Sequence, residues 1–212
     1  YVDMYERTQQ LKDPASPIYG CDAFWNTFWN LNQLWALATP DIMNKWVESL
    51  LEYYRVGGSL PNGPPGVEYC DIMGAQHEIP LMVSAYQKGI RNYDVDKAYE
   101  AVKKTLTTQG TALSSGGIVG NRHLDVYLKY GFVPYGEKSH HNVFGTTYEG
   151  PTSNTLEYAF DDWNAAQFAK ALGYEEDYDY FTRRAYNYKN VFYSETRYVL
   201  SLIHISEPTR RR

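Results

Sequence analysis

The sequence lacks any long hydrophobic run. Nowhere in its 212 residues do about 18 apolar residues follow one another, the length that a membrane-spanning helix needs. No charged segment followed by a short apolar segment opens the chain, so these residues predict no signal peptide. Basic residues are also few, because 20 Lys and Arg stand against 25 Asp and Glu and give a formal net charge of −5. Since nucleic-acid binding needs a basic surface, this balance argues against a nucleic-acid partner.

Cysteine is scarce and aromatic residues are abundant. The chain has two cysteines, Cys21 and Cys70, which are too few for a disulfide framework and do not have the spacing of a metal site. Their positions in the sequence predict no pairing, because a disulfide needs a strict geometry. By contrast, 21 Tyr and 5 Trp raise the aromatic share to 16%. Aromatic residues at this density build either a large core or a surface that stacks on flat ligands and sugar faces.

The two ends of the chain differ from its body. The sequence starts at Tyr1 rather than at Met, and its last residues, 201–212, contain three Arg and one Glu in a pattern unlike the rest. This segment resembles translated sequencing-adapter read-through more than protein, with a genuine basic tail as the alternative. We therefore expect a native body over 1–200, truncated at both ends, and a non-native tail over 201–212 that is left out of the fold prediction.

Three segments have the apolar spacing of an amphipathic helix. The first begins at the N-cap Thr39 and ends at the pair Gly57 and Gly58, since glycine suits the left-handed conformation of a helix C-cap. The second begins at Asp94 and ends before Gly110, and the third begins after Gly173.

A helix of another kind is predicted before each amphipathic one, over residues 24–38, 71–89 and 154–172. These segments are apolar on more than one face, which predicts burial on several sides, and Pro80 is expected to kink the second. The order of buried helix and amphipathic helix, three times over, predicts an all-α fold of three helical hairpins. Such hairpins build either a toroid or an α-solenoid, and the absence of a fixed repeat of about 34 residues weakens the solenoid interpretation.

Candidate functional residues collect near the starts of the buried helices. Trp25 and Trp29 are four residues apart, as are Glu157 and Asp161, so each pair would share a helix face. Paired carboxylates are what glycoside hydrolysis needs, and carboxylate with amide oxygens also suits Ca²⁺. Structural roles stay open beside these: acids near a helix start favour the macrodipole, tryptophans fill cores, and a lone His77 on an apolar helix can simply be a core residue.

The neighbouring acids Asp161 and Asp162 cannot both belong to such a site. Consecutive helix residues point about 100° apart, so only one of them can point where Glu157 points.

Three stretches together resemble glycoside hydrolase family 92, the calcium-dependent exo-acting α-mannosidases. They run from Phe24 to Trp35, from Gly57 to Ala101, and from Ser153 to Trp163, with further matches up to Asn190. The resemblance covers most of residues 20–198. The family fold is a β-sandwich followed by an (α/α)6 barrel, so the resemblance implies that the three hairpins form roughly half of an (α/α)6 toroid.

The resemblance also implies an activity. Family members release mannose from glycans with inversion, α-1,2-linked mannose most typically, and Ca²⁺ binds the sugar hydroxyls and helps distort the ring. The catalytic acid Glu and base Asp are expected downstream of this chain, so no catalytic residue and no metal ligand is expected within it. A mannose-containing glycan would be the partner, and the full-length protein would be extracellular or periplasmic.

Residue by residue, the resemblance assigns substrate-site positions. Trp25 matches the family Trp, whereas Asn26 stands where the family usually has Asp and Trp29 where it often has Arg. An Asn offers one acceptor and two donors where an Asp accepts only, so the standard mannose contact is placed in doubt. The expected substrate-binding residues are Trp25, Asn26, Trp29, Glu68, His77, Glu157 and Asp161.

Two other hypotheses remain open from the residues. The chain could belong to another (α/α)6 glycoside hydrolase, such as a trehalase-like or glucosidase-like enzyme, or it could be a helical-repeat binding module without catalysis. Hairpins that curve in one direction favour a toroid, and a straight superhelical stack favours the repeat module.

Overall fold

A computed structural model describes residues 1–11, 13–20, 24–63, 74–113, 118–135 and 150–200, together with the backbone of 202–204 and 207–208. The α-helices are α1 (Leu31–Ala38), α2 (Pro40–Gly57), α3 (Glu78–Gln87), α4 (Val95–Thr107), α5 (Leu124–Tyr130), α6 (Pro151–Leu172) and α7 (Glu175–Ala185). Two 3-10 helices, η1 (Thr27–Trp29) and η2 (Tyr186–Val191), precede α1 and follow α7.

The strands are short and form three separate antiparallel pairs. These are β1 (Thr111–Ala112) with β2 (Ile118–Val119), β3 (Phe192–Tyr193) with β4 (Tyr198–Val199), and β5 (Leu202–His204) with β6 (Glu207–Pro208). The fold is therefore all-α, as the sequence predicts.

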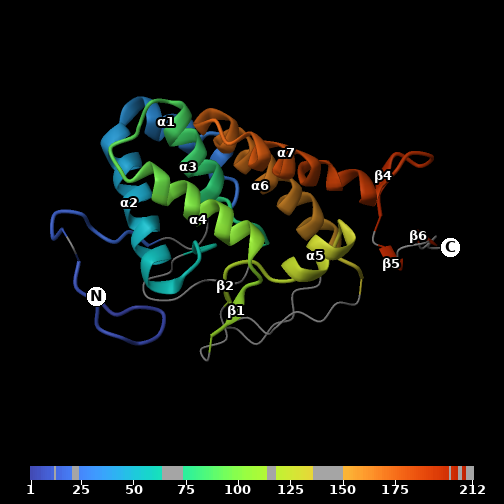
Figure 1. The fold of residues 1–212 in the computed structure, drawn as a ribbon, viewed down its shortest axis with the longest axis horizontal. Helices are drawn as coiled ribbons and strands as arrows, with labels where there is room; N and C mark the ends of the chain where they lie inside the picture. Colours follow the sequence, from blue (N-terminus) through green and yellow to red (C-terminus); the bar gives the residue numbers. More distant parts are fainter. Residues whose placement is uncertain are drawn as a thin grey trace.

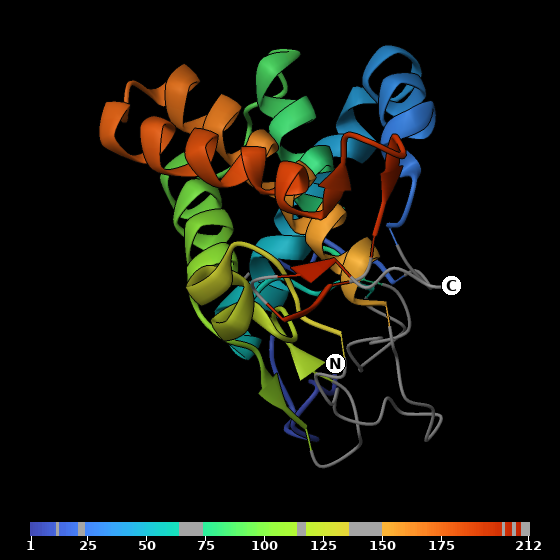
Figure 2. The ribbon, with the colours of Figure 1, turned by 90° about the vertical axis from the view of Figure 1, so that its right-hand side faces the viewer.

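The helices form three hairpins, α1–α2, α3–α4 and α6–α7, which follow one another from left to right in sequence order (Figure 1). The first members form one row, because α3 contacts α1 on one side and α6 on the other. Among the second members, α2 contacts α4. A view turned by 90° looks onto the end of the row that carries α6 and α7 (Figure 2). The predicted order of three helical hairpins is thus confirmed.

Local sequence explains where the hairpin helices begin and end. Pro40 occupies the first turn of α2, where its missing N–H costs no hydrogen bond, and Gly58 closes α2 in a left-handed conformation at φ 83°. The Asp94 side chain accepts a hydrogen bond of 2.9 Å from the backbone N–H of Lys97 and so caps α4. Gly173, at φ 82°, ends α6 in the same way as Gly58 ends α2.

The first buried helix differs from its prediction over 24–38. Asn26 adopts a left-handed conformation at φ 69° and Asn30 is also non-helical, so only η1 and then α1 form in this segment. Burial on several sides is wrong here too, because Leu34 is 59% and Leu37 is 83% exposed. The reason is the position of α1 at the end of its row, where α2 and α3 cover only part of its surface.

The predicted kink at Pro80 is also wrong. Since α3 begins at Glu78, Pro80 lies in the first turn, where backbone N–H groups have no partner within the helix in any case. Two further differences concern the ends of the third hairpin and the loop before it. Helix α7 ends at Ala185, so Tyr188 lies beyond it and is 41% exposed, and α5 forms between the second and third hairpins, where no helix was predicted.

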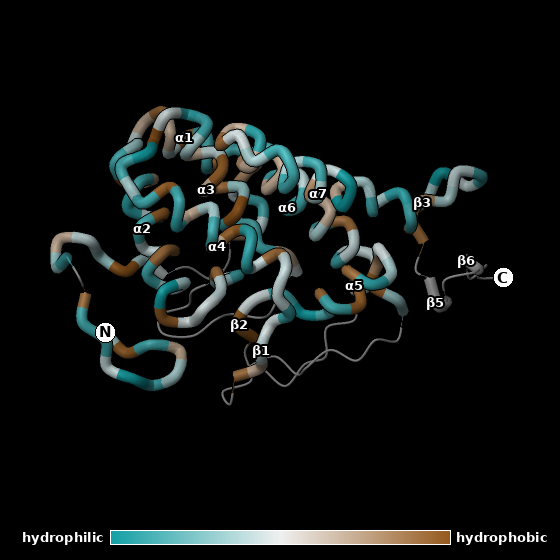
Figure 3. The backbone as a smooth tube through the Cα atoms, in the orientation of Figure 1, coloured by the Kyte–Doolittle hydropathy of each residue, from teal (hydrophilic) through white to brown (hydrophobic). Residues whose placement is uncertain are grey.

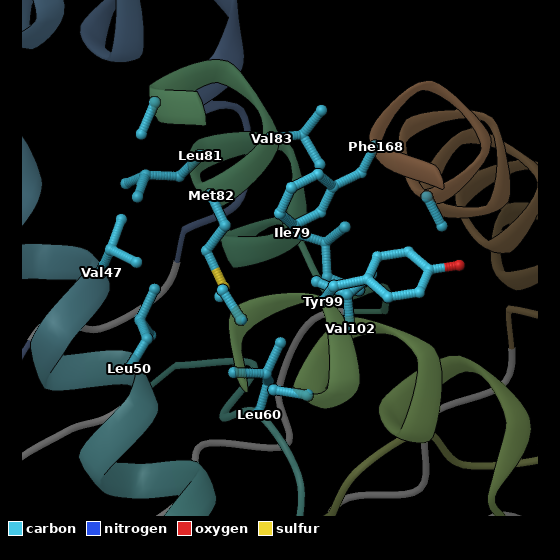
Figure 4. Packing of buried hydrophobic residues seen from close by; sticks show 14 of the residues in the cluster. Val47, Leu50, Leu60, Ile79, Leu81, Met82, Val83, Tyr99, Val102 and Phe168 are labelled. Carbon is cyan, nitrogen blue, oxygen red and sulfur yellow. The ribbon is translucent and has the colours of Figure 1, made fainter. Parts of the chain in front are cut away.

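One apolar core joins the three hairpins. Figure 4 shows residues of α2, α3, α4 and α6 meeting in it, among them Val47, Met82, Val102 and Phe168. The helix α3 in the middle of the row is hydrophobic along much of its length, whereas α7 on the outside is mainly hydrophilic (Figure 3). This core fixes the N-terminus of α3 against α6, where the candidate site lies.

Candidate functional site

Two predicted site residues meet between α3 and α6. His77 lies immediately before α3 and is 2% exposed, and its Nε2 atom lies 2.8 Å from Oε2 of Glu157 on α6. The Glu157 side chain is 26% exposed, so solvent reaches part of it, whereas the imidazole is almost fully buried. The structure therefore brings together a buried imidazole and a partly exposed glutamate side chain that the sequence separates by 80 residues.

The hydrogen bonds of His77 indicate which tautomer its ring adopts. The backbone N–H of Asn26 donates to Nδ1 of His77 at 3.2 Å, so Nδ1 is an acceptor and carries no proton. The proton of a neutral imidazole then resides on Nε2, which donates to Glu157. Asn26 presents its N–H through its left-handed backbone, which asparagine tolerates better than most residues. Its observed contribution to the site is thus a backbone contact.

Two phenylalanines enclose the imidazole. Phe28 of η1 meets the His77 ring edge-on, with 5.3 Å between ring centroids, and Phe160 of α6 does the same at 5.9 Å. Phe28 and Phe160 also contact each other at 4.6 Å. Edge-on aromatic packing of this kind keeps water away from the ring and fixes its orientation. Sequence reasoning missed both residues, although Phe28 lies between the two candidate tryptophans.

Asp161 lies behind the imidazole and Glu157, away from solvent. It is fully buried, and its Oδ2 accepts a 2.8 Å hydrogen bond from the backbone N–H of Gln76, the residue before His77. Burial raises the pKa of Asp161 to about 7, although His77 and the Gln76 N–H act in the opposite direction. Asp161 therefore holds the segment that carries His77 and does not contact solvent itself.

Asp162 points the other way, as the helix geometry predicts. Its Oδ1 lies 2.7 Å from Nη2 of Arg184 on α7, and its Oδ2 accepts a hydrogen bond from the Tyr127 hydroxyl of α5 at 2.9 Å. Burial raises the pKa of Asp162 to about 7, against the opposing effects of Arg184 and Tyr127. Sequence reasoning did not assign Tyr127 or Arg184 as partners, because both contacts join elements that are distant in the chain.

The two candidate tryptophans are exposed. Trp25 is 42% and Trp29 is 70% exposed, and the Trp29 ring contacts the Phe28 ring at 6.3 Å. The prediction that they share an α-helical face is wrong, because the segment from Trp25 to Asn30 is not α-helical. The interpretation of both as core residues is also wrong for the described part of the chain, given their exposure.

Three residues considered in the sequence analysis lie outside the described residues. They are the candidate site residue Glu68 and the two cysteines, Cys21 and Cys70. Within the described ranges, no group of three or more His, Cys, Asp or Glu side chains could hold a metal ion. No helix in that part of the chain is long and apolar enough to cross a membrane.

A cavity of about 280 Å³ lies elsewhere, between the N-terminal segment, α2 and the start of α4. None of its lining residues belongs to the cluster around His77. Polar groups at its wall already pair with one another: Ser16 donates to Glu48 at 3.0 Å and Arg55 to Glu52 at 2.6 Å. The chemistry of the candidate site therefore lies around His77 and Glu157 and outside this cavity.

Comparisons with known proteins concern the family and the overall fold of the chain. Residues 1–201 match the glycosyl hydrolase family 92 catalytic domain. A curated relative, described as an uncharacterized secreted glycosidase of Arthroderma benhamiae, is 27% identical over 186 residues, which are 81% of this chain and 23% of the relative.

Solved structures from Bacteroides thetaiotaomicron are similar over most of the chain. A family 92 inverting mannosidase is 28% identical with a TM-score of 0.74, over 90% of this chain and 24% of its own. A family 92 alpha-mannosidase in complex with mannoimidazole is 27% identical with a TM-score of 0.75, over 95% of this chain and 24% of its own. The chain thus spans about a quarter of the length of the relatives it matches.

Proposed function

The chain belongs to glycosyl hydrolase family 92, and on this premise we propose that it is part of an inverting α-mannosidase that releases terminal mannose from glycans. Similarity to an inverting mannosidase and to an alpha-mannosidase of the same family supports this activity. The observation that carries the proposal is the partly exposed Glu157 side chain bonded to the buried His77, with Phe28 in contact with both His77 and the exposed Trp29.

Each of these groups has a role in binding a sugar. The Nε2–H of His77 occupies one oxygen of Glu157 and fixes its orientation, which leaves the other oxygen to accept a hydrogen bond from a sugar hydroxyl. The exposed rings of Trp25 and Trp29 offer flat apolar faces to the C–H face of a pyranose. Glu157, Trp25 and Trp29 then bind the substrate, while His77 and Asp161 hold the site in place.

The catalytic carboxyl pair and the calcium ion belong, on this proposal, to parts of the protein beyond the described residues. No group of three or more His, Cys, Asp or Glu side chains that could hold a metal ion lies among the described residues. When bound, the ion would hold sugar hydroxyls and favour a distorted ring. The roles of His77, Glu157 and the tryptophans do not depend on it.

The secreted relative and the glycan substrate together support an extracellular or periplasmic location for the full-length protein. Fractionation of cells that express the complete gene tests this location.

Hydrolysis by two lengths of the protein tests the activity. The 212-residue chain alone should release no mannose from an α-1,2-linked mannobiose, and the full-length protein should release it with inversion, which NMR detects as the first anomer formed. In the full-length protein, Glu157→Gln and Trp29→Ala should each lower kcat/KM by roughly 10-fold to 100-fold, the loss of one charged hydrogen bond or one stacking face. Tyr198→Ala is the matched control, because Tyr198 is 72% exposed on β4.

Other outcomes would support the alternatives. Hydrolysis of trehalose or a glucoside, without release of mannose, would indicate a different glycosidase specificity. Glycan binding without hydrolysis by the full-length protein would indicate a binding module. Release of mannose by the 212-residue chain alone would show that the catalytic pair lies within it.

A further inference from the structure

Two residues that hold His77 have left-handed backbones. Asn26 lies at φ 69°, and Ala75, two residues before His77, lies at φ 75°. Residues other than glycine rarely adopt this conformation; asparagine tolerates it, whereas the Cβ of alanine makes it costly. Ala75 is also buried, at 2% exposure. A conformation of this kind persists only where surrounding contacts impose it, and such residues cluster at functional sites.

The peptide group that joins Ala75 and Gln76 is bonded on both sides. The side-chain Nδ2 of Asn62 donates a hydrogen bond to the carbonyl oxygen of Ala75. On the other side of the same peptide group, the N–H of Gln76 donates to Oδ2 of Asp161 at 2.8 Å. The left-handed turn at Ala75 thus orients this peptide group between two partners, immediately before the residue that carries the imidazole.

The imidazole of His77 is bonded on both sides as well. The backbone N–H of Asn26 lies 3.2 Å from Nδ1, and Oε2 of Glu157 lies 2.8 Å from Nε2. No hydrogen bond joins the Asn26 side chain to any residue that the structure describes. What position 26 supplies to His77 is therefore a backbone N–H, and its direction is set by the left-handed conformation.

We propose that Asn26 is a positioning residue that acts through its backbone: its left-handed N–H selects the His77 tautomer with the proton on Nε2 and so keeps Glu157 as an acceptor. The other tautomer would place two donors face to face at Nδ1 and two acceptors face to face at Nε2, so it would lose both bonds. The left-handed turn at Ala75 supports the same arrangement by placing the ring. The consequence for binding of a sugar rests on the proposed function, whereas the choice of tautomer does not.

Substitutions can separate the backbone conformation from the side chain. Asn26→Gly removes the side chain and keeps an N–H in a conformation that glycine adopts freely. Asn26→Val also keeps the N–H, but a β-branched residue strongly disfavours a positive φ. Ala75→Gly removes the Cβ and keeps the left-handed turn. Arg197→Val is the matched control, because Arg197 is exposed and has a φ of 60° in the turn between β3 and β4.

The ¹⁵N chemical shifts of the His77 ring in the 212-residue chain test the tautomer. We expect a proton on Nε2 and none on Nδ1 in the wild type, Asn26→Gly, Ala75→Gly and Arg197→Val. In Asn26→Val we expect the signals of the other tautomer or of a mixture of the two, with circular dichroism to verify that the variant is folded. If Asn26→Val does not fold, Asn26→Ala imposes the same preference more weakly and is read in the same way.

Three results would overturn the proposal. The first is a wild-type ring with its proton on Nδ1. The second is a folded Asn26→Val, or Asn26→Ala in its place, with the wild-type shifts. The third is a changed tautomer in Asn26→Gly, which would show that the side chain of Asn26 matters and not its backbone. A changed tautomer in Ala75→Gly would remove Ala75 from the arrangement.

Kinetics of the full-length protein test whether the tautomer acts through Glu157. Asn26→Val should lower kcat/KM for α-1,2-linked mannobiose by about 10-fold, Asn26→Gly should recover most of this loss, and Arg197→Val should change nothing. In the Glu157→Gln background, Asn26→Val should add little further loss, because both changes affect one contact. Losses that multiply would show that Asn26 acts separately from Glu157. If the NMR results hold while the full-length protein hydrolyses no mannoside, the proposed function fails and the choice of tautomer stands.

Discussion

The imidazole of His77 and the carboxylate of Glu157 come from positions 80 residues apart, and their Nε2 and Oε2 atoms lie 2.8 Å from each other. One group precedes α3 and the other belongs to α6. The site therefore depends on how α3 packs against α6, and substitutions at this contact should change the stability of the chain.

A double-mutant cycle measures this contact. His77→Ala should lower the free energy of unfolding by about 2–4 kcal/mol, because it removes two hydrogen bonds and leaves a cavity in a site that is 2% exposed. Glu157→Gln should cost less than about 1 kcal/mol, because Glu157 is partly solvated and keeps an acceptor oxygen. Urea denaturation of both single variants and the double variant gives the coupling energy. A coupling of zero would show that the His77–Glu157 bond contributes nothing to folding.

The ion pair between Asp162 and Arg184 gives a second prediction. Asp162→Asn should destabilise the chain by about 3–5 kcal/mol, because it leaves the guanidinium of Arg184 buried without a counter-charge. Replacing both partners, with Asp162→Leu and Arg184→Met, should recover most of this loss in thermal unfolding. Arg183→Met is the control, since Arg183 is exposed and should change the stability little. A double variant as unstable as Asp162→Asn would contradict the interpretation.

The stability should depend on pH through Asp161. Burial raises its pKa from 3.8 to about 7, so between these values the folded state binds a proton that the unfolded state has released. This contribution is complete below the unfolded pKa and is lost as the pH rises towards about 7, by up to about 4 kcal/mol in total. Urea midpoints measured at pH values from about 5 to 8 should therefore fall for the wild type and fall less for Asp161→Asn. A midpoint that rises over this range in the wild type would contradict the prediction.

Asp177 has the opposite effect on the pH dependence of the stability, and it does so at lower pH. Burial raises its pKa, but hydrogen bonds from Lys103 and Tyr99 outweigh burial and lower it overall. Its contribution is present at neutral pH and is lost as the pH falls, so Asp177→Asn should lower the stability at neutral pH, change it little in acid, and flatten the acid side of the curve measured by urea denaturation.

The exposed apolar surface of α1 and the start of α2, made by Leu34, Leu37 and Ile42, predicts self-association. Their exposures of 59%, 83% and 42% are high for apolar side chains so close in the sequence. In the whole protein we expect a further helical hairpin to cover this surface. In the 212-residue chain, Leu37→Glu should reduce association in sedimentation velocity without lowering the melting temperature, and Tyr198→Glu should leave association unchanged. Equal association in the wild type and Leu37→Glu would show that another surface is responsible.

The division of the chain into 1–200 and 201–212 stays a prediction. Removal of 201–212 should leave the melting temperature within about 1 °C of the full chain, because a non-native tail adds no packing to the three hairpins. A larger loss on thermal unfolding would show that the segment packs against the body.

The features best predicted from the sequence are those that neighbouring residues determine, such as the limits of helices. The limits of α2 and α4 follow from local capping, by Pro40 and Gly58 in one and Asp94 in the other, and both helices are where they were expected. The all-α fold of three hairpins follows in the same way from periodicity. The divergent orientations of Asp161 and Asp162 were predictable too, because helix geometry alone determines them.

Contacts between elements that are distant in the chain could not be predicted from the residue pattern. The non-helical backbone of Asn26 shortened the first buried helix. The Asn26 N–H donates a hydrogen bond to His77, a contact that no motif suggests. The contacts of Tyr127 and Arg184 with Asp162 join α5, α7 and α6. No pattern in the sequence marks Glu78 as buried, although the structure buries it completely.

The two aspartates in the middle of α6 have a consequence for how that helix is oriented. Helix α6 is 22 residues long and buries side chains on most of its circumference, so apolar patterning alone leaves its rotation about its own axis weakly determined. Asp161 bonds to the segment before α3 and Asp162 to Arg184 of α7, in directions about 100° apart. Any turn of α6 about its axis would break both bonds at once. The two bonds thus fix the rotation of α6 about its axis. This rotation points Glu157, one helical turn earlier, toward His77.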